Sequence, residues 1–220
     1  GDNAVVIALA ARSLPLAQRK QAILWGAGAA VILRIVLTVF AVALLALPWL
    51  KIIGSLLLFW IGIKLLAGDD DDADINASEH LVTAIKTILI ADLVMSLDNV
   101  IAVAAAAGGS MTLLILGLAI SIPLVVFGAT LLVNLMERYP VIITIGAGLI
   151  GWVAGEMLVT DPVLAGWLTG LGVTFNQGKP SVGELSLELV AGAVGVAIVI
   201  GWGLWLAKRQ EVSAKAEPDK

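Results

Sequence analysis

The chain has 220 residues, of which 60% are hydrophobic and 14% are charged, and its mean hydropathy is +1.04. Soluble domains contain about 45–50% apolar and about 25% charged residues, so a water-soluble fold is excluded and the bilayer is the expected solvent. Because the chain has no cysteine, disulfides and thiolate ligands are excluded. The single histidine, His80, excludes a multi-histidine zinc site. The net charge is −4 and no basic stripe is present, so the sequence gives no support for nucleic-acid binding.

Long apolar runs separated by short polar breaks predict the membrane helices in chain order. The first run, 2–11, covers only about 16 Å as a helix, so we read it as the second half of a helix that begins upstream of Gly1. Further helices are predicted over 21–47, 49–66, 81–107, 112–135, 141–159 and 186–207. The prediction is an all-α membrane protein of one domain, 1–220, with seven transmembrane helices, the first of them truncated.

Two connections are longer than the others. The first, 68–80, carries the acidic run Asp69–Asp72 and Asp74, and the second, 161–183, is rich in Gly, Thr and Pro. We expect the tail 210–220 to be disordered.

Basic residues predict the orientation, because Lys and Arg concentrate in the short cytoplasmic loops of membrane proteins. Only Lys51 and Lys179 fall on one side, whereas the other side collects Arg12, Arg19, Lys20, Lys64, Arg138, Lys208 and Arg209. The C-terminus and the acidic connection are therefore predicted to be cytoplasmic, and the 161–183 loop non-cytoplasmic.

An internal repeat relates the two halves of the chain. A constant offset of 92 residues joins Pro48, Gly54, Trp60, Lys64 and Asp69 to Pro140, Gly146, Trp152, Glu156 and Asp161. Asp2-Asn3 lies 96 residues before Asp98-Asn99. Because each copy (about 1–66 and 81–159) contains three helices, an odd number, the two copies are expected to be inverted, as in transporters whose site lies near the midplane. The seventh helix stands outside the repeat.

Ionisable residues inside the predicted helices mark a candidate site, because each costs about 2.5–3.5 kcal/mol at a helix centre on insertion scales. Asp92, Ser96 and Asn99 share one face of a regular helix, and Asp98 lies about 120° away from Asp92. Both carboxylates reach one site only if that site lies between them or if the helix is locally unwound.

The first copy adds Asp2 and Asn3 from the other side of the pseudo-two-fold axis. The combined set of carboxylate, amide and hydroxyl oxygens suits Mg²⁺, Ca²⁺ or Mn²⁺. Interhelical hydrogen bonding that holds the bundle together is the structural alternative.

Four residues are candidates for supporting roles, each with a purely structural alternative. Met95 either packs or supplies a thioether that favours Mn²⁺ over Mg²⁺, and Arg34 either packs or neutralises an aspartate when no ion is bound. Lys64 and Glu156, at equivalent repeat positions, are predicted to form an ion pair across the pseudo-symmetry axis, either structural or gating.

At Gly1-Asp2-Asn3-Ala4 and Ser96-Leu97-Asp98-Asn99-Val100 the chain resembles the TerC family of bacterial integral membrane proteins, up to about Ala207. Short, single-domain members of the YjbE type are the most similar. The family belongs with the LysE-like exporters; some members are implicated in manganese efflux and others are associated with tellurium resistance. The resemblance implies the metal-site residues Asp2, Asn3, Asp92, Asp98 and Asn99, and a further aspartate six residues before Asp2, which falls upstream of Gly1.

We therefore expect a Mn²⁺ or similar divalent-cation exporter of the bacterial inner membrane that works by alternating access. Its expected partners are the lipid bilayer and the transported ion, with no prosthetic group, and a homo-oligomer is left open. No P-loop, HExxH or GxSxG is present, so no enzymatic activity is expected.

Three alternatives stay open at this point. An exporter of Ca²⁺ would use the same oxygen ligands, and an exporter of an amino acid would have to accommodate the substrate's own carboxylate beside three aspartates. A membrane scaffold that helps to metallate or insert exported proteins would depend on the 161–183 loop rather than on Asp2 and Asp98.

Overall fold

The structure is a computed structural model that describes residues 2–40, 47–68, 77–106, 111–176, 179–183 and 185–216. Within these ranges, the side chains at 39, 77–78, 97–106, 111, 113–114, 176 and 213–216 lie outside the description.

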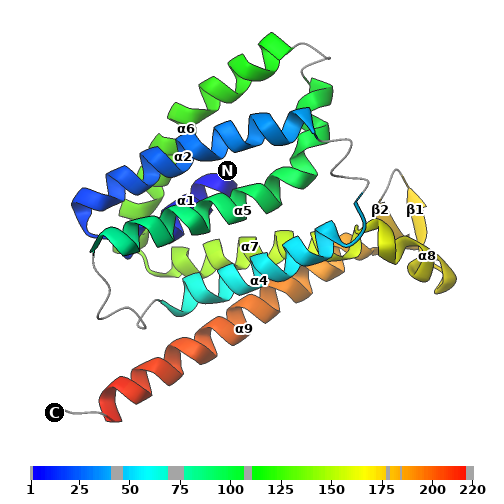
Figure 1. Cartoon of the computed structure of the whole chain (residues 1–220). Helices are drawn as coiled ribbons and strands as arrows, with labels where there is room; N and C mark the ends of the chain where they lie inside the picture. Colours follow the sequence, from blue (N-terminus) through cyan, green and yellow to red (C-terminus); the bar gives the residue numbers. More distant parts are fainter. Residues whose placement is uncertain are drawn as a thin grey trace.

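Helices dominate the chain (Figure 1). Their bounds are α1 Asp2–Ala11, α2 Leu16–Val39, α4 Leu50–Ala67, α5 Ala77–Ala106, α6 Met111–Arg138, α7 Val141–Val159, α8 Pro162–Gly170 and α9 Leu187–Ala216. Within the described ranges, α2, α4, α6, α7 and α9 are long and apolar enough to cross a membrane. The ten residues of α1 are too few for a span, and the 30-residue α5, which carries Lys86 and Asp92, falls outside this set of five.

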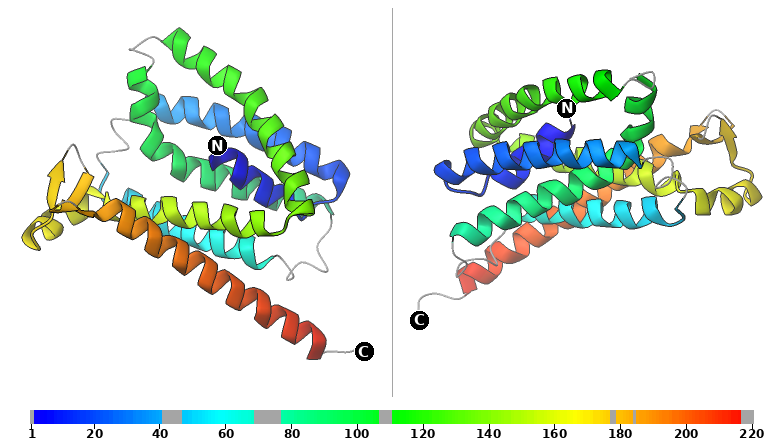
Figure 2. Two further views of the ribbon diagram at one scale, coloured as in Figure 1. Left: turned by 180° about the vertical axis from the view of Figure 1, so that it is seen from behind. Right: turned by 45° about the horizontal axis from the view of Figure 1, so that its top comes forward.

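The helices form two groups. Helices α4, α7 and α9 lie side by side, and α2, α5 and α6 surround the short α1 (Figures 1 and 2). Seven of the ten residues of α1 are buried, including Val6, Ile7 and Leu9. A helix that is apolar all round is expected at the centre of a bundle; at its start Asp2 is exposed and Asn3 is partly buried.

Two glycines on α7 set the closest helix contact. A Cβ added at Gly151 would lie 2.5 Å from the Gly195 carbonyl oxygen, and one at Gly155 would lie 2.0 Å from the Ala191 carbonyl oxygen. The backbones of α7 and α9 therefore touch, as small residues allow in membrane bundles. The helix outside the repeat is thereby joined tightly to the second repeat copy.

Several helix ends differ from the predicted ones. α2 begins at Leu16, directly after Pro15, rather than at residue 21, and it ends at Val39 rather than at 47. α9 continues to Ala216, so a disordered tail from 210 is not observed up to that residue. The early start of α2 and the late end of α9 have the same physical reason: hydropathy detects the apolar part of a helix, whereas polar residues with good helix propensity extend helices beyond the apolar run.

The 161–183 connection is folded, which the sequence analysis missed. It contains α8 and an antiparallel sheet of β1 Thr174–Asn176, β2 Lys179–Val182 and β3 Leu185–Ser186, in which Phe175 pairs with Pro180 and Val182 with Leu185. Apart from this small sheet, the described residues form an all-helical protein, as predicted. Asp161-Pro162 is a typical helix start, an Asx N-cap before a proline in the first turn, and would have predicted α8.

Asp161 links this connection to the membrane helices. Its side chain is 1% exposed and accepts hydrogen bonds from Val163 N at 2.8 Å and from Lys51 N and Ile52 N at 3.1 Å each. One carboxylate thus satisfies otherwise unpaired N–H groups at the starts of both α8 and α4.

Replacement of Asp161 by alanine should lower the free energy of unfolding by about 2 kcal/mol or more, because it leaves buried N–H donors unsatisfied. Asp161→Asn keeps one acceptor oxygen and should lose less. Thermal unfolding in detergent, monitored by tryptophan fluorescence, gives the melting temperatures of both variants. Equal melting temperatures would contradict the conclusion that the Asp161 carboxylate caps both α4 and α8.

The α7–α9 contact predicts a second difference in stability. Gly155→Ala forces the two backbones apart and should markedly lower the melting temperature. Gly148→Ala, on the same helix, meets only side-chain atoms at 3.4 Å or more and is the matched control. Similar melting temperatures for both variants would show that the helices are not in backbone contact.

Candidate functional site

The centre of the candidate site is an ion pair between α2 and α5. The guanidinium Nη2 of Arg34 binds Asp92 Oδ1, and the two side chains are 14% and 6% exposed. An ionised group taken out of water at this depth has to be paired, because the desolvation cost is several kcal/mol per ion. Arg34 and Asp92 are thus paired, and the role in which Arg34 neutralises an aspartate when no ion is bound stays a prediction.

Two further polar side chains complete the arrangement around the ion pair. Arg34 Nε donates to Ser96 Oγ at 3.0 Å, and Ser96 Oγ donates to Asp92 Oδ2 at 3.3 Å. Ser96 lies one turn after Asp92, as the predicted spacing of four residues requires. Once its amide is oriented with the oxygen toward Arg34, Asn3 on α1 accepts a hydrogen bond from Nη1 at 3.0 Å and a second from Nη2.

Asp2 adds a second negative charge at the start of α1. Its carboxylate is near enough to Asp92 to repel it electrostatically. Asn3 and Asp92 also line the same narrow space, together with Val6, Ile7, Ile88 and Met95, which leaves no room for a water molecule. Asp2, Asn3, Asp92, Ser96, Arg34 and Met95 are thus gathered from α1, α2 and α5.

Asp98 and Asn99 have their backbone in α5, but their side chains lie outside the description. Of the two alternatives for Asp92 and Asp98, local unwinding is not observed, since α5 is helical from Ala77 to Ala106. Its second part nevertheless turns away from the direction of the first part (Figures 1 and 2). Among the side chains that are described, no three His, Cys, Asp or Glu residues gather at metal-binding distance.

The predicted ion pair between Lys64 and Glu156 is wrong. A Cβ at Gly54 meets Met157 and one at Gly62 meets Ile150, so α4 and α7 run antiparallel. In that register Lys64 and Glu156 are about eight residues, or about 12 Å, apart along the pair. Lys64 Nζ instead lies 5.8 Å from the ring centre of Trp60 on its own helix.

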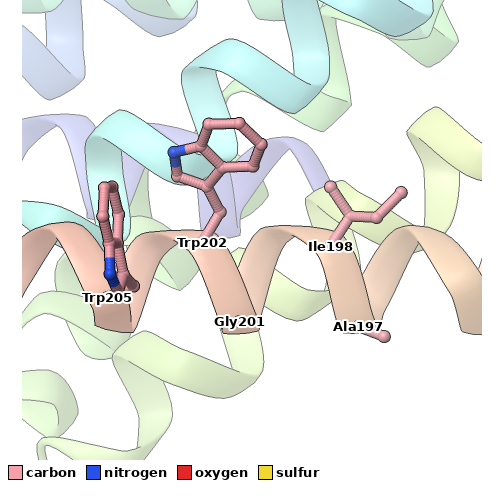
Figure 3. Close-up of a pocket in the computed structure, with 5 residues that line it drawn as sticks. All are labelled: Ala197, Ile198, Gly201, Trp202 and Trp205. Atoms are coloured by element: carbon pink, nitrogen blue, oxygen red, sulfur yellow. The ribbon is translucent and has the colours of Figure 1, made fainter.

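A wide hollow on the surface of the described residues is separate from these side chains. It lies on α9, where Trp202, Trp205 and Ile198 project outward above Gly201 (Figure 3). Its lining is almost entirely apolar and its tryptophans are more than half exposed, as expected of a face that meets lipid. It offers no ligand for a cation.

The comparisons with known proteins agree with the resemblance noted from the motifs. The sequence profile of the Integral membrane protein TerC family matches residues 1–211. The chain belongs to the TerC family. It is thus a multi-pass integral membrane protein of a bacterial-type family.

Three membrane proteins of Bacillus subtilis (strain 168) are similar to this TerC-family chain. YjbE is 47% identical over 165 residues, which cover 75% of this chain and 76% of YjbE. YkoY and YceF are 26% and 27% identical over 178 and 166 residues, each match covering 71% of this chain. The chain spans 54% of YkoY and 64% of YceF. No solved structure matches the chain.

The ion pair predicts strong coupling between Arg34 and Asp92. Arg34→Leu should lower the free energy of unfolding by about 3–5 kcal/mol, because it leaves the Asp92 carboxylate buried and uncompensated. The double variant Arg34→Leu/Asp92→Leu removes both charges and should recover much of that loss. Melting temperatures of both single variants and the double variant give the coupling energy, and simple additivity would contradict a buried pair.

Proposed function

We propose that this TerC-family protein exports a divalent cation, with Mn²⁺ as the preferred ion, and that the cation binds at Asp92. The observation that carries the proposal is the buried Asp92 carboxylate, compensated by one guanidinium that Asn3 and Ser96 also hold. The Asp2 carboxylate, at the exposed start of α1, adds a second negative charge near Asp92, and two neighbouring carboxylates attract a divalent cation.

In the proposed cycle, Arg34 and the cation are alternative partners of Asp92. Without an ion, the guanidinium compensates the carboxylate. When a divalent cation binds to the oxygens of Asp92, Asn3 and Ser96, it repels the Arg34 guanidinium. The Asp92 carboxylate is therefore compensated by a positive charge both with and without the bound ion. Asp98 and Asn99, on the same helix, would complete the ligand set.

The packing of the helices is consistent with two inverted three-helix repeats. A two-fold exchange would map α1 on α5, α2 on α6 and α4 on α7. Accordingly, α1 contacts α6 and α7, and its equivalent α5 contacts α2 and α4. Each helix also contacts the equivalent helix of the other repeat: α1 contacts α5, α2 contacts α6 and α4 contacts α7. The equivalent glycines behave in the same way: Gly54 faces Val94 on α5, and Gly146 faces Val5 and Leu9 on α1. This supports the proposal of alternating access between two related halves.

The basic residues support a cytoplasmic C-terminus. Arg19 pairs with Glu137 and also donates to the Arg12 carbonyl, and Arg12 donates to the Leu65 carbonyl. These contacts bring the ends of α1, α2, α4 and α6 together at one end of the bundle. Lys51 contacts Thr160 at the opposite end, beside α8. By the positive-inside rule, the end with Arg12 and Arg19 faces the cytoplasm.

The chemistry of the site favours Mn²⁺ among the hard cations. Carboxylate, amide and hydroxyl oxygens suit Mg²⁺, Ca²⁺ and Mn²⁺ alike, but the buried Met95 lines the same space as Asn3 and Asp92. A neighbouring thioether favours the softer Mn²⁺ over Mg²⁺. An amino acid would bring a carboxylate against Asp2 and Asp92, which disfavours that class of substrate.

A second candidate function, a scaffold for exported proteins, is favoured by the folded 161–183 connection. Trp167 and Leu171 of this region are 65% and 63% exposed at the end of the bundle opposite Arg12. Such a role would depend on these side chains. A Trp167→Ser/Leu171→Ser variant that keeps full cation export but fails in the assembly of an exported metalloprotein would favour the scaffold.

The proposal predicts Mn²⁺ uptake into inverted membrane vesicles that contain the protein. Asp92→Asn and, separately, Asp98→Asn should reduce this uptake at least about tenfold, since a neutral amide cannot offset the charge of the ion. Glu188→Gln is the matched control, because Glu188 contacts Lys179 at 3.6 Å outside the site and should leave uptake unchanged. Equal uptake by Asp92→Asn and the parent protein would remove the intramembrane site from the mechanism.

Two additions to the same assay test ion preference and driving force. Excess Mg²⁺ measures selectivity directly. Because no ATP-binding motif is present, we propose that protons exchange on the same carboxylates, and an imposed pH gradient should change the Mn²⁺ flux. Flux that ignores the gradient would exclude proton coupling.

A further inference from the structure

A small polar cavity lies between α1 and α5 at the end of the bundle that carries Arg12. Its volume is about 30 Å³, enough for one or two water molecules. The lining is Ala10, Ser13, Leu14, Leu65, His80, Thr83, Ala84 and Thr87, none of which carries a fixed charge. Ser13, one of the lining residues, is exposed, so the cavity lies close to the surface at this end.

The polar side chains of this cavity suit a hydrated cation. Thr87 Oγ1 donates its proton to the Thr83 carbonyl at 3.0 Å, so the lone pairs of the hydroxyl remain as acceptors. Thr83 and Ser13 add two more hydroxyls, and His80 adds an imidazole. Arg12 lines a different groove, with Arg19 and Glu137.

The cavity lies on the same stripe of α5 as the ion pair. Residues 80, 83/84, 87/88, 91/92 and 95 recur at helical spacing and therefore share one face. Opposite them, Ala10 of α1 and Ser13, just after α1, line the cavity, and Ile7 and Asn3 of α1 line the Asp92 site. From Thr87 to Asp92 the distance along the helix axis is about 7.5 Å.

An apolar layer separates the cavity from Asp92. Val6 and Ile7 on α1 and Ile88 on α5 are 2%, 3% and 1% exposed. On its other side, Ile88 meets α2 at Gly26, where an added Cβ would lie 2.8 Å from Ile88 Cδ1. This layer leaves no water-sized path between the two polar regions.

We propose that this cavity is the inner mouth of the cation path, and that Val6, Ile7 and Ile88 form its closed gate. The inference rests on the proposed function for the identity of the cargo, a hydrated divalent cation. The hydroxyls of Ser13, Thr83 and Thr87 replace part of the ion's water shell as it enters, and separation of α1 from α5 widens the cavity and admits the ion to Asp92.

Thiol labelling tests the mouth without any reference to transport. The chain contains no cysteine, so single cysteines are introduced into the whole protein at Thr83→Cys, Thr87→Cys and Ile90→Cys. Ile90 lies further along α5 from the cavity, does not line it and is 36% exposed, so it is the control that faces lipid. A charged methanethiosulfonate reagent, which reacts with the thiolate in water, should modify the cysteines at 83 and 87 at least about tenfold faster than the one at 90. Labelling should be seen in inverted vesicles, where the predicted cytoplasmic side is outside.

Mn²⁺ uptake in the same vesicles tests the gate. Gly26→Ala pushes Ile88 further between α1 and α5 and should slow uptake several-fold. Gly28→Ala, two residues away on α2, has open space at the added methyl group and should have no effect. Ile88→Ala should speed the labelling of Thr87→Cys and increase passive Mn²⁺ leak.

The two measurements separate the two proposals. Labelling at 83 and 87 that is no faster than at 90 overturns the inner mouth, whatever the uptake. Fast labelling together with equal uptake by the Gly26→Ala and Gly28→Ala variants overturns the gate. Absence of Mn²⁺ uptake by vesicles that contain the protein without any substitution overturns the proposed function. This outcome does not depend on the cysteine or glycine variants.

Discussion

The ion pair between Arg34 and Asp92 is the constraint on which the arrangement of the first helix group depends. Two ionised groups in an apolar bundle have to be held together, and their remaining hydrogen-bonding capacity has to be met. Ser96 and Asn3 provide these contacts. Because Arg34 is on α2, Asp92 and Ser96 are on α5 and Asn3 is on α1, satisfying one charge fixes the relative positions of three helices.

The second helix group is held together in a different way. Gly151 and Gly155 bring the backbone of α7 against that of α9, and Asp161 ties the starts of α4 and α8 together. These contacts involve backbone atoms and leave little freedom for sliding. By contrast, α1 and α5 meet through side chains around a polar cavity. Under the proposed transport cycle, α4, α7 and α9 would act as the rigid part, and α1 and α5 would move.

The distribution of polar groups along α1 and α5 gives the proposed path its order. Hydroxyls lie at the end near Arg12, an apolar layer follows, and the charged cluster lies beyond it. A hydrophobic layer between two polar regions is an effective barrier to ions, because a cation cannot shed its water without new ligands. A modest separation of two helices would remove the barrier without disturbing the α7–α9 contact.

The sequence by itself determined the membrane class, most of the helices and the family, because apolar runs and the Asp-Asn motifs are local signals. It also identified Asp2, Asn3, Asp92, Ser96 and Arg34 as residues of interest, since charge inside an apolar run is visible without coordinates. Only the tertiary structure decided which of them meet. Arg34 and Asp92 are 58 residues apart in the chain, and their contact depends on how α2 packs against α5. The same reason explains the failed pairing of Lys64 with Glu156: repeat position says that two residues are equivalent, whereas the antiparallel register of α4 and α7 places equivalent residues far apart.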